Sequence, residues 1–435
     1  MDLKEKLISE FKTFESYLNG SAAGKIHDTR MDAKKYFELL GFPNRKMEDW
    51  RFTNINPIIS NLYYQVNDTV IPVKEIDIEK FFIPGLSANI IVFVNGKYSE
   101  KHSKIIKKEN LFIGTFRDAL KQKPELIEKY FAKFADYKND GFTALNTAYT
   151  IDGVFVHIGK NLVVEEPIII LNVVDSSPFE VIYNPRNLII TEESSISSVI
   201  ELYESEGSNF SFSNAVTEII AGNNSEINYY KIQNDGEKKY HVGTTQISQE
   251  RNSSVKSFTL TWGGSIIRNN LNTRFNGEGG ECDMKGLFIA KDNQQIDNHT
   301  FTDHAIPNCH SNELYKGIMD DSSNGIFNGK IMVRKDAQKT NAYQMNKNII
   351  LSKKALVNSK PQLEIFADDV KCSHGATTGQ LDEEQLFYLK TRGIGEDKGK
   401  KLLLYAFANE VIDDVKIESL RIYLQNILKK KLGEK

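Results

Sequence analysis

The sequence of 435 residues has few cysteines: Cys282, Cys309 and Cys372 lie far apart, and three thiols cannot all be paired. We therefore expect no disulfide framework. Three thiolates are also one fewer than the four that hold a metal cluster within a single chain. No stretch comes near the roughly 18 consecutive apolar residues that a membrane-spanning helix needs. The first residues mix charges and contain no apolar signal-peptide core, so we expect a cytoplasmic location.

Neither positive nor negative charge is in large excess. The 55 Lys and Arg residues against 58 Asp and Glu residues leave a formal net charge of −3, which argues against nucleic-acid binding through a diffuse basic surface. The motifs HExxH, GxSxG and CxxC are absent, so zinc-protease, α/β-hydrolase and dithiol chemistries lack support. A phosphate-binding loop is absent too, because Gly393 and Gly395 do not have the required spacing from Gly399, and Lys401 replaces Ser or Thr. Any use of ATP must then depend on another chain.

Hydrophobic periodicity divides the chain into three regions. Residues 1–145 are expected to form a mostly helical N-terminal domain, since apolar residues at positions 7, 11, 14 and 18 share one helical face. Residues 146–378 instead contain short runs of β-branched and aromatic residues separated by turn-forming residues. Residues 379–435 return to helical spacing and are expected to form a C-terminal helical domain.

The turn clusters of the middle region are close to periodic. They recur at Ser195, Ser225, Ser254 and Gly280, in steps of 30, 29 and 26 residues. Such steps favour stacked coils of two strands each, whereas a large antiparallel sandwich, the alternative, has turn signals about every 8–12 residues. We predict a mainly β fold with a parallel β-helix core of roughly eight coils, about 40 Å long.

The C-terminal region is predicted to contain three helices, near residues 382–392, 396–411 and 417–427. Their apolar faces are broad for so small a unit. Two arrangements fit this pattern: the helices pack on one another and on the rod, or they leave a face free for a partner.

The most informative chemical feature is the pair Cys372 and His374. In an extended strand these residues lie on the same face, with Cα atoms about 6.5–7 Å apart. A thiol and an imidazole at this spacing can reach one metal ion, or the imidazole can stabilise a thiolate. Two ligands make an incomplete site, which suggests completion by another subunit. The alternative is that Cys372 is a small buried hydrophobe and His374 a hydrogen-bonded turn residue.

Four segments carry a resemblance to a known family. They are residues 369–377 (DVKCSHGAT), 385–394 (QLFYLKTRGI), 41–53 and 307–317. The sequence resembles the SufB/SufD family of iron–sulfur cluster assembly proteins in all of them. The resemblance implies a right-handed parallel β-helix core between N-terminal and C-terminal helical domains, which agrees with the periodicity above.

Within this family the motif is similar to the SufD members rather than the SufB members. Gly375 follows the motif histidine, where SufB proteins tend to carry Glu. The resemblance implies a non-enzymatic scaffold subunit that pairs with SufB through the β-helix cores. A transient iron–sulfur cluster then forms at the interface, with Cys372 and His374 as metal ligands shared with the partner subunit.

The resemblance also implies that the C-terminal helical domain binds the SufC ATPase. The candidate docking residues are those of the second motif: Leu386, Phe387, Tyr388, Arg392 and Gly393. A flavin in the complex, a homodimer of the isolated chain, and the roles of Cys282 and Cys309 are left open. Two rival interpretations are a β-helix carbohydrate-active enzyme of the polysaccharide lyase type and a self-associating structural protein.

Overall fold

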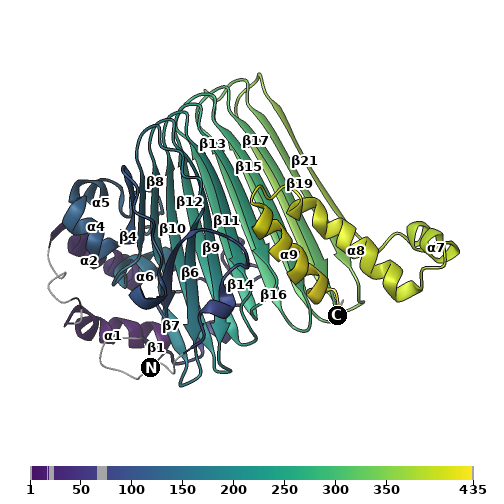
Figure 1. Ribbon diagram of the computed structural model, residues 1–435, viewed down its shortest axis with the longest axis horizontal. Helices are drawn as coiled ribbons and strands as arrows, with labels where there is room; N and C mark the ends of the chain where they lie inside the picture. The colour runs from purple at the N-terminus through teal and green to yellow at the C-terminus, as the bar shows by residue number, and fades with distance from the viewer. Residues whose placement is uncertain (1, 17, 19–23, 66–75, 434–435) are drawn as a thin grey trace.

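The computed structural model describes residues 2–16, 18, 24–65 and 76–433. The middle of the chain winds into a parallel β-solenoid of about eight turns, with helices toward both ends of the chain (Figure 1). This confirms the predicted β-helix core between helical regions. No helix within these ranges is long and apolar enough to cross a membrane.

Each turn of the solenoid contributes one strand to each of two sheets. Each long strand inside the stack pairs in parallel with the strands one turn before and after it, and the last two, β20 and β21, pair only with the turn before. Sheet A contains β1 (Tyr64–Gln65), β4 (Leu111–Thr115), β5 (Val154–Ile158), β7 (Val181–Tyr183), β8 (Arg186–Thr191), β10 (Ser211–Ala221), β12 (Lys239–Gln249), β14 (Ile266–Phe275), β16 (Gln295–His304), β18 (Asn324–Val333) and β20 (Leu356–Ile365). Sheet B contains β2 (Asn89–Val94), β3 (Lys97–Tyr98), β6 (Ile168–Asp175), β9 (Ile196–Glu206), β11 (Glu226–Gln233), β13 (Ser254–Thr261), β15 (Glu281–Ala290), β17 (His310–Met319), β19 (Asn341–Ile350) and β21 (Lys371–Gly379).

Helices precede and follow the solenoid along the sequence. The α-helices are α1 (Leu3–Ser16), α2 (Gly24–Leu40), α3 (Asn56–Ile59), α4 (Phe116–Gln122), α5 (Pro124–Tyr130), α6 (Gly141–Ala148), α7 (Glu383–Thr391), α8 (Glu396–Ile412) and α9 (Glu418–Lys431). Three short 3₁₀ helices are η1 (Glu48–Trp50), η2 (Glu79–Phe81) and η3 (Glu100–His102). Strands β2 and β4 lie within the region expected to be mostly helical, yet they extend sheets B and A.

The corners explain the periodicity of the turn clusters. At the corner from sheet A to sheet B, Ser194, Asn224 and Asn252 adopt left-handed backbone conformations with φ of 57°, 54° and 54°. Short polar side chains tolerate this conformation because they can bond to nearby backbone groups. The next residue is a buried serine in all three corners: the hydroxyls of Ser195, Ser225 and Ser253 donate to the carbonyls three residues earlier, at 2.7, 2.8 and 2.7 Å. These three coils therefore use the same kind of short polar residues at the same place, whereas Lys339 takes the equivalent conformation in the corner between β18 and β19.

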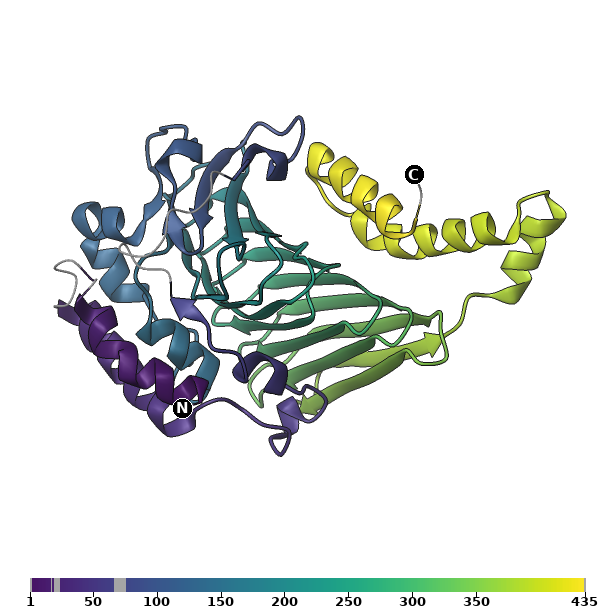
Figure 2. The same ribbon diagram turned by 90° about the horizontal axis from the view of Figure 1, so that it is seen from below.

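Both sheets also bury their outer faces, and they use different parts of the chain to do so. Helices α1, α2 and α6 cover the outer face of sheet A, where Phe11, Phe37 and Phe142 pack with Phe212 and Tyr240. The outer face of sheet B is covered by the second half of α8 and by α9 (Figure 2). Leu404, Val411, Leu420, Leu424 and Leu428 belong to the same apolar cluster as strands β9, β11 and β13. Helices α8 and α9 thus pack on one another and on the solenoid, as in the first of the two expected arrangements, whereas no residue of α7 is fully buried.

Segment 41–53, one of the motif segments, crosses the outer face of sheet A. The Trp50 ring lies under the Arg268 guanidinium, 4.3 Å from its centroid. Arg268 Nη1 lies 2.6 Å from Asp297 Oδ2, which also accepts from the Thr53 hydroxyl. Burial by itself raises the pKa of Asp297, but Arg268, His299 and Thr53 outweigh it, and the net pKa is well below the usual range. The motif therefore anchors the N-terminal region to the solenoid.

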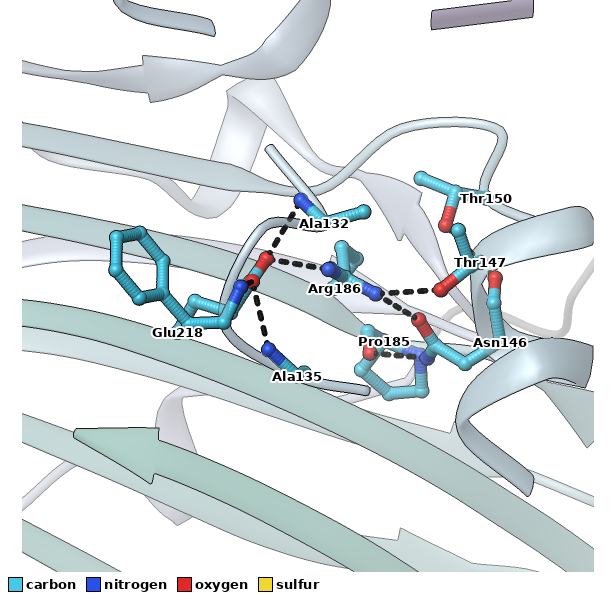
Figure 3. Close-up of polar contacts among 9 residues, drawn as sticks. Ala132, Ala135, Asn146, Thr147, Thr150, Pro185, Arg186 and Glu218 are labelled. Carbon is cyan, nitrogen blue, oxygen red and sulfur yellow. Dashed lines mark hydrogen bonds and ion pairs between the residues drawn. The ribbon is translucent and has the colours of Figure 1, made fainter. Parts of the chain in front are cut away.

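A second anchor is a fully buried ion pair, Arg186 with Glu218, on neighbouring strands β8 and β10 (Figure 3). The exposed fraction of both side chains is 0%. The Glu218 carboxylate accepts backbone N–H groups from Ala132, Phe134 and Ala135, at 2.9, 2.8 and 3.0 Å. Ala132 has a φ of 54°, a conformation unfavourable for alanine, so this carboxylate holds a strained loop against sheet A.

The arginine completes this anchor toward helix α6. Arg186 Nη1 donates to the side-chain oxygens of Asn146 and Thr147, at 3.2 and 3.0 Å. The pair thus joins a loop, a helix and two strands in the protein interior. Removing one partner of a buried ion pair leaves the other charge uncompensated, and this usually destabilises the folded protein more than removing both partners does.

We expect Glu218→Gln to lower the free energy of unfolding by about 3–5 kcal/mol, because it leaves the Arg186 charge buried without a counter-ion. The matched control is Glu226→Gln, since Glu226 makes an exposed pair with Lys256 at 3.9 Å and such pairs contribute about 0–1 kcal/mol. Urea unfolding of both variants measures the difference. Equal effects of the two substitutions would show that the buried pair is not an anchor.

Candidate functional site

The structure places Cys372 and His374 on β21, the last strand of sheet B. β21 pairs with β19 alone, and the register sets Cys372 beside Ala342 and His374 beside Gln344. Ala342 and Gln344 are buried, whereas Tyr343 between them is 47% exposed. Cys372 and His374 therefore share the face that points toward the interior of the solenoid.

This end of the solenoid is open. In the described part of the chain, neither β20 nor β21 has a strand on its outer edge. No further coil covers their inward side chains, so most residues of these two strands are partly or fully exposed, in contrast to the buried strands before them. The backbone groups on these edges can pair with another chain.

The thiol and the imidazole differ in their surroundings. Cys372 is half-buried against a small apolar cluster that includes Val333, Ala342 and Ala367, while His374 is exposed. Burial raises the pKa of the Cys372 thiol, with a smaller opposing contribution from the backbone at Ala342. Among the described residues no hydrogen bond or ion pair joins Cys372 to His374. The arrangement thus favours two separate soft donors over an imidazole-stabilised thiolate.

The donor set at the open end is incomplete. Across the described residues, no three His, Cys, Asp or Glu side chains are close enough together to hold a metal ion. Cys372 and His374 supply one sulfur and one nitrogen, and iron–sulfur clusters and tetrahedral metal centres need four ligands in total. A metal held here requires ligands beyond those that the described residues supply.

The other two cysteines lie inside the solenoid. Cys282 is in the same register column as Cys372, separated from it by Ser311 and Ala342 on the intervening coils. Burial raises the pKa of Cys282 to about 12. Cys309 is fully buried, and its thiol donates to the carbonyl of Gly277 at 3.4 Å. Both therefore pack as small buried thiols in this structure.

Polar residues behind the site were missed by the sequence analysis. Glu313 and Gln344 occupy the two coils before His374 at the same register position. Gln344 Nε2 donates to Glu313 Oε2 at 2.8 Å, and burial raises the pKa of Glu313 to about 7. The signal available in the sequence is their recurrence about one coil apart, at positions 313, 344 and 374.

The candidate docking residues lie on α7 and its C-terminal end, beyond the body of the solenoid (Figures 1 and 2). Phe387 and Tyr388 are 68% and 57% exposed, while Leu386 lies against Gly399 of α8. Arg392 Nη2 donates to the Tyr388 hydroxyl at 3.0 Å. Gly393 has a φ of 81° and ends the helix, a conformation that favours glycine. Two consecutive residues thus expose their aromatic rings to solvent.

A cleft of about 450 Å³ lies between the outer face of the last sheet B strands and helices α7 and α8. Lys316 and Lys347 from the sheet and Gln385 and Glu410 from the helices contribute to its lining. Lys316 Nζ donates to the Phe407 carbonyl at 2.8 Å and pairs with Glu410, which ties α8 to the solenoid. Strand β21 and helix α7 are joined by only three residues, 380–382, at this cleft.

Comparisons with known proteins point to one family. A model of the SufBD core domain of SUF system FeS cluster assembly matches residues 173–407, and a model of the SufBD protein N-terminal region matches residues 1–170. A SufBD family iron–sulfur cluster assembly protein of Synechocystis is 30% identical over 418 residues, covering 94% of this chain and 91% of its own. The iron–sulfur cluster assembly protein SufD of Escherichia coli is 27% identical, covering 88% and 87%. SufD of Bacillus subtilis is also 27% identical, covering 94% of each chain.

We expect a thiol reagent to modify Cys372 rapidly in the folded protein and to reach Cys282 and Cys309 only after unfolding. Because the thiolate is the reactive form and burial raises the pKa of Cys372, the rate should increase about tenfold per pH unit from about pH 7 to about pH 8 and go on rising above that. Stopped-flow absorbance with Cys372→Ser as the control measures this. A rate that levels off below about pH 8, or a fast phase that survives in the control, would contradict the assignment.

Proposed function

The chain belongs to the SufBD family of the SUF iron–sulfur cluster assembly system, and on this basis we propose that it is a SufD-type scaffold subunit of the assembly complex. The observation that carries the proposal is the open end of the solenoid, where two soft donors stand beside unpaired strand edges. The role is non-enzymatic and cytoplasmic. No phosphate-binding motif is present in the sequence, so ATP hydrolysis belongs to a bound partner.

The partner at the open end is SufB in this proposal. A second solenoid can pair its own strand edge with β20 or β21 and bury the inward side chains that the last coil leaves exposed. Ile365 on β20 continues the inward column of the buried Val333 and is 40% exposed, which is apolar area that such an interface would remove from water. Pairing of two copies of this chain is the competing use of the same edges.

The cargo of the site is the nascent iron–sulfur cluster. Cys372 offers a thiol that becomes a thiolate on binding iron, and His374 offers a neutral imidazole nitrogen. The remaining ligands come from the partner subunit, so the isolated chain should hold no stable cluster. A flavin is not needed for this role, and a flavin bound by the complex is a separate hypothesis. The family match gives no support to the polysaccharide lyase alternative.

SufC is proposed to dock on α7. The second half of α8 and α9 are already used to cover sheet B, whereas α7 only half-buries Leu386 and Leu389 against α8 and leaves its other side chains exposed. Exposed aromatic residues beside an arginine are typical of energetically important interface positions. Phe387, Tyr388 and Arg392 form such a group, with Leu386 and Gly393 fixing the helix.

We predict that His374→Ala, in a complex reconstituted anaerobically with SufB and SufC, sharply reduces cluster formation. The reason is the loss of a nitrogen ligand that the rest of the chain cannot replace. Cys372→Ser should cause a similar loss if the sulfur is a ligand and a smaller one if it only tunes the site. Visible absorbance of the cluster is the measurement, and His102→Ala, far away on η3, is the matched control. Normal cluster yield from the double variant would refute a metal-binding role.

For the docking surface, the double substitution Phe387→Ala and Tyr388→Ala should weaken SufC binding at least tenfold, because it removes the exposed aromatic pair but leaves the α8–α9 packing intact. Ile422→Ala removes a comparably exposed apolar side chain from α9 and should change little. Isothermal titration with purified SufC measures both. Unchanged affinity of the double variant would place the docking surface elsewhere.

A further inference from the structure

Three polar residues occupy one position on three successive coils of sheet B. The parallel register sets Glu313 of β17 beside Gln344 of β19, and Gln344 beside His374 of β21. All three side chains are on the interior face of the sheet. Glu313 and Gln344 are each 2% exposed, whereas His374 is on the uncovered last coil. They form a polar column that begins inside the solenoid and ends at its open end.

The amide of Gln344 is held from two sides. Its Nε2 donates to Glu313 Oε2 at 2.8 Å, toward the inner coil. Across the interior lies Gly329 of β18, where a Cβ atom would come within 2.2 Å of the same nitrogen. No side chain fits at position 329 while the amide keeps this place. The nitrogen end of the amide is therefore fixed on the side away from His374.

The oxygen end of the same amide has no partner. Within the described residues Gln344 Oε1 is buried and accepts no hydrogen bond. A buried carbonyl oxygen without a donor is unfavourable, so a donor is expected nearby. The neighbouring amide of Asn346 is already engaged, since its Nδ2 donates to the Tyr315 carbonyl and its Oδ1 accepts from Asn348 and Ser359. The ring of His374, one coil outward in register, carries an N–H and makes no described hydrogen bond.

We propose that Gln344 is a positioning residue for His374: its Oε1 accepts the N–H of one ring nitrogen and thereby leaves the other ring nitrogen free to bind iron at the open end. A histidine that binds a metal usually donates its second ring N–H to a carboxylate or carbonyl, which fixes the tautomer and the orientation of the ring. Glu313 orients the amide, and Gly329 leaves the space for it. This role rests on the proposed function of His374 as a ligand.

The first measurement uses the full chain with ¹⁵N-labelled histidine, and the His374 resonances are assigned with His374→Ala. In the wild type, the ring nitrogens should show one dominant neutral tautomer at a pH above the histidine titration. Gln344→Met removes the acceptor but keeps the length of the side chain, and we expect it to give a mixture of tautomers. Gln122→Met, an exposed position at the end of α4, is the control and should leave the tautomer unchanged.

The second measurement is anaerobic cluster formation in the complex with SufB and SufC. Gln344→Met should lower cluster yield or iron affinity about 10–100-fold, which is the usual effect of losing such a partner of a metal ligand. Gly329→Ala tests the same geometry from the opposite sheet, because it displaces the amide without removing it, and should act in the same direction. Circular dichroism and urea unfolding establish that each variant is folded.

The outcomes separate this inference from the proposed function. If His374→Ala abolishes the cluster while Gln344→Met changes neither the tautomer nor the yield, the positioning role is wrong and the ligand role stands. If His374→Ala has no effect on the cluster, the ligand role is wrong, and the tautomer measurement alone decides whether Gln344 orients the ring. A mixed tautomer in the wild type overturns the inference directly.

Discussion

Parallel, in-register pairing of each coil with its neighbours is the constraint on which this structure depends. A strand inside the stack has both edges bonded, so only the first and last coils leave backbone groups to be satisfied. At one end the N-terminal region extends both sheets, with β4 antiparallel to β5 and β2 added to β6, and strands β5 and β6 there are buried along their whole length. At the other end, within the described chain, β20 and β21 have no such cover. The stack thus has one closed end and one open end, and the motif residues are at the open one.

The same pairing determines what lies behind the site. Because each residue stands beside its counterpart one coil away, a side chain at the open end continues a column that runs into the solenoid. Cys372 continues a column through Ala342 and Ser311 to Cys282, and His374 continues one through Gln344 to Glu313. The first column is small and mostly apolar, the second polar and hydrogen-bonded. The Cys372 thiol therefore lies in front of small side chains, whereas the His374 imidazole, two residues further along the strand, lies in front of hydrogen-bonding side chains.

The sequence predicted the features that depend on local repetition. Coils were predictable because Ser195 and Ser225 follow corner residues that are short and polar, and the shared face of Cys372 and His374 follows from the two-residue period of a strand. Features that depend on remote pairing were not predictable. The number of residues in each corner sets the register, so the spacing of positions 313, 344 and 374 does not by itself establish that Gln344 lies beside His374. The Arg186–Glu218 anchor involves a loop more than 50 residues before Arg186. Across 186 residues, the backbone N–H of Lys416, just before α9, donates to the hydroxyl of Tyr230 on β11.

The central claim is that His374 of this chain binds the cluster at the interface with the partner subunit. The most direct test is electron spin echo envelope modulation of the reduced cluster in a complex that carries ¹⁵N-histidine in this chain only. The account predicts a ¹⁵N coupling from a directly bound imidazole, and its loss in His374→Ala. A cluster that shows no ¹⁵N coupling in the wild type, or the same coupling after the substitution, would contradict the account.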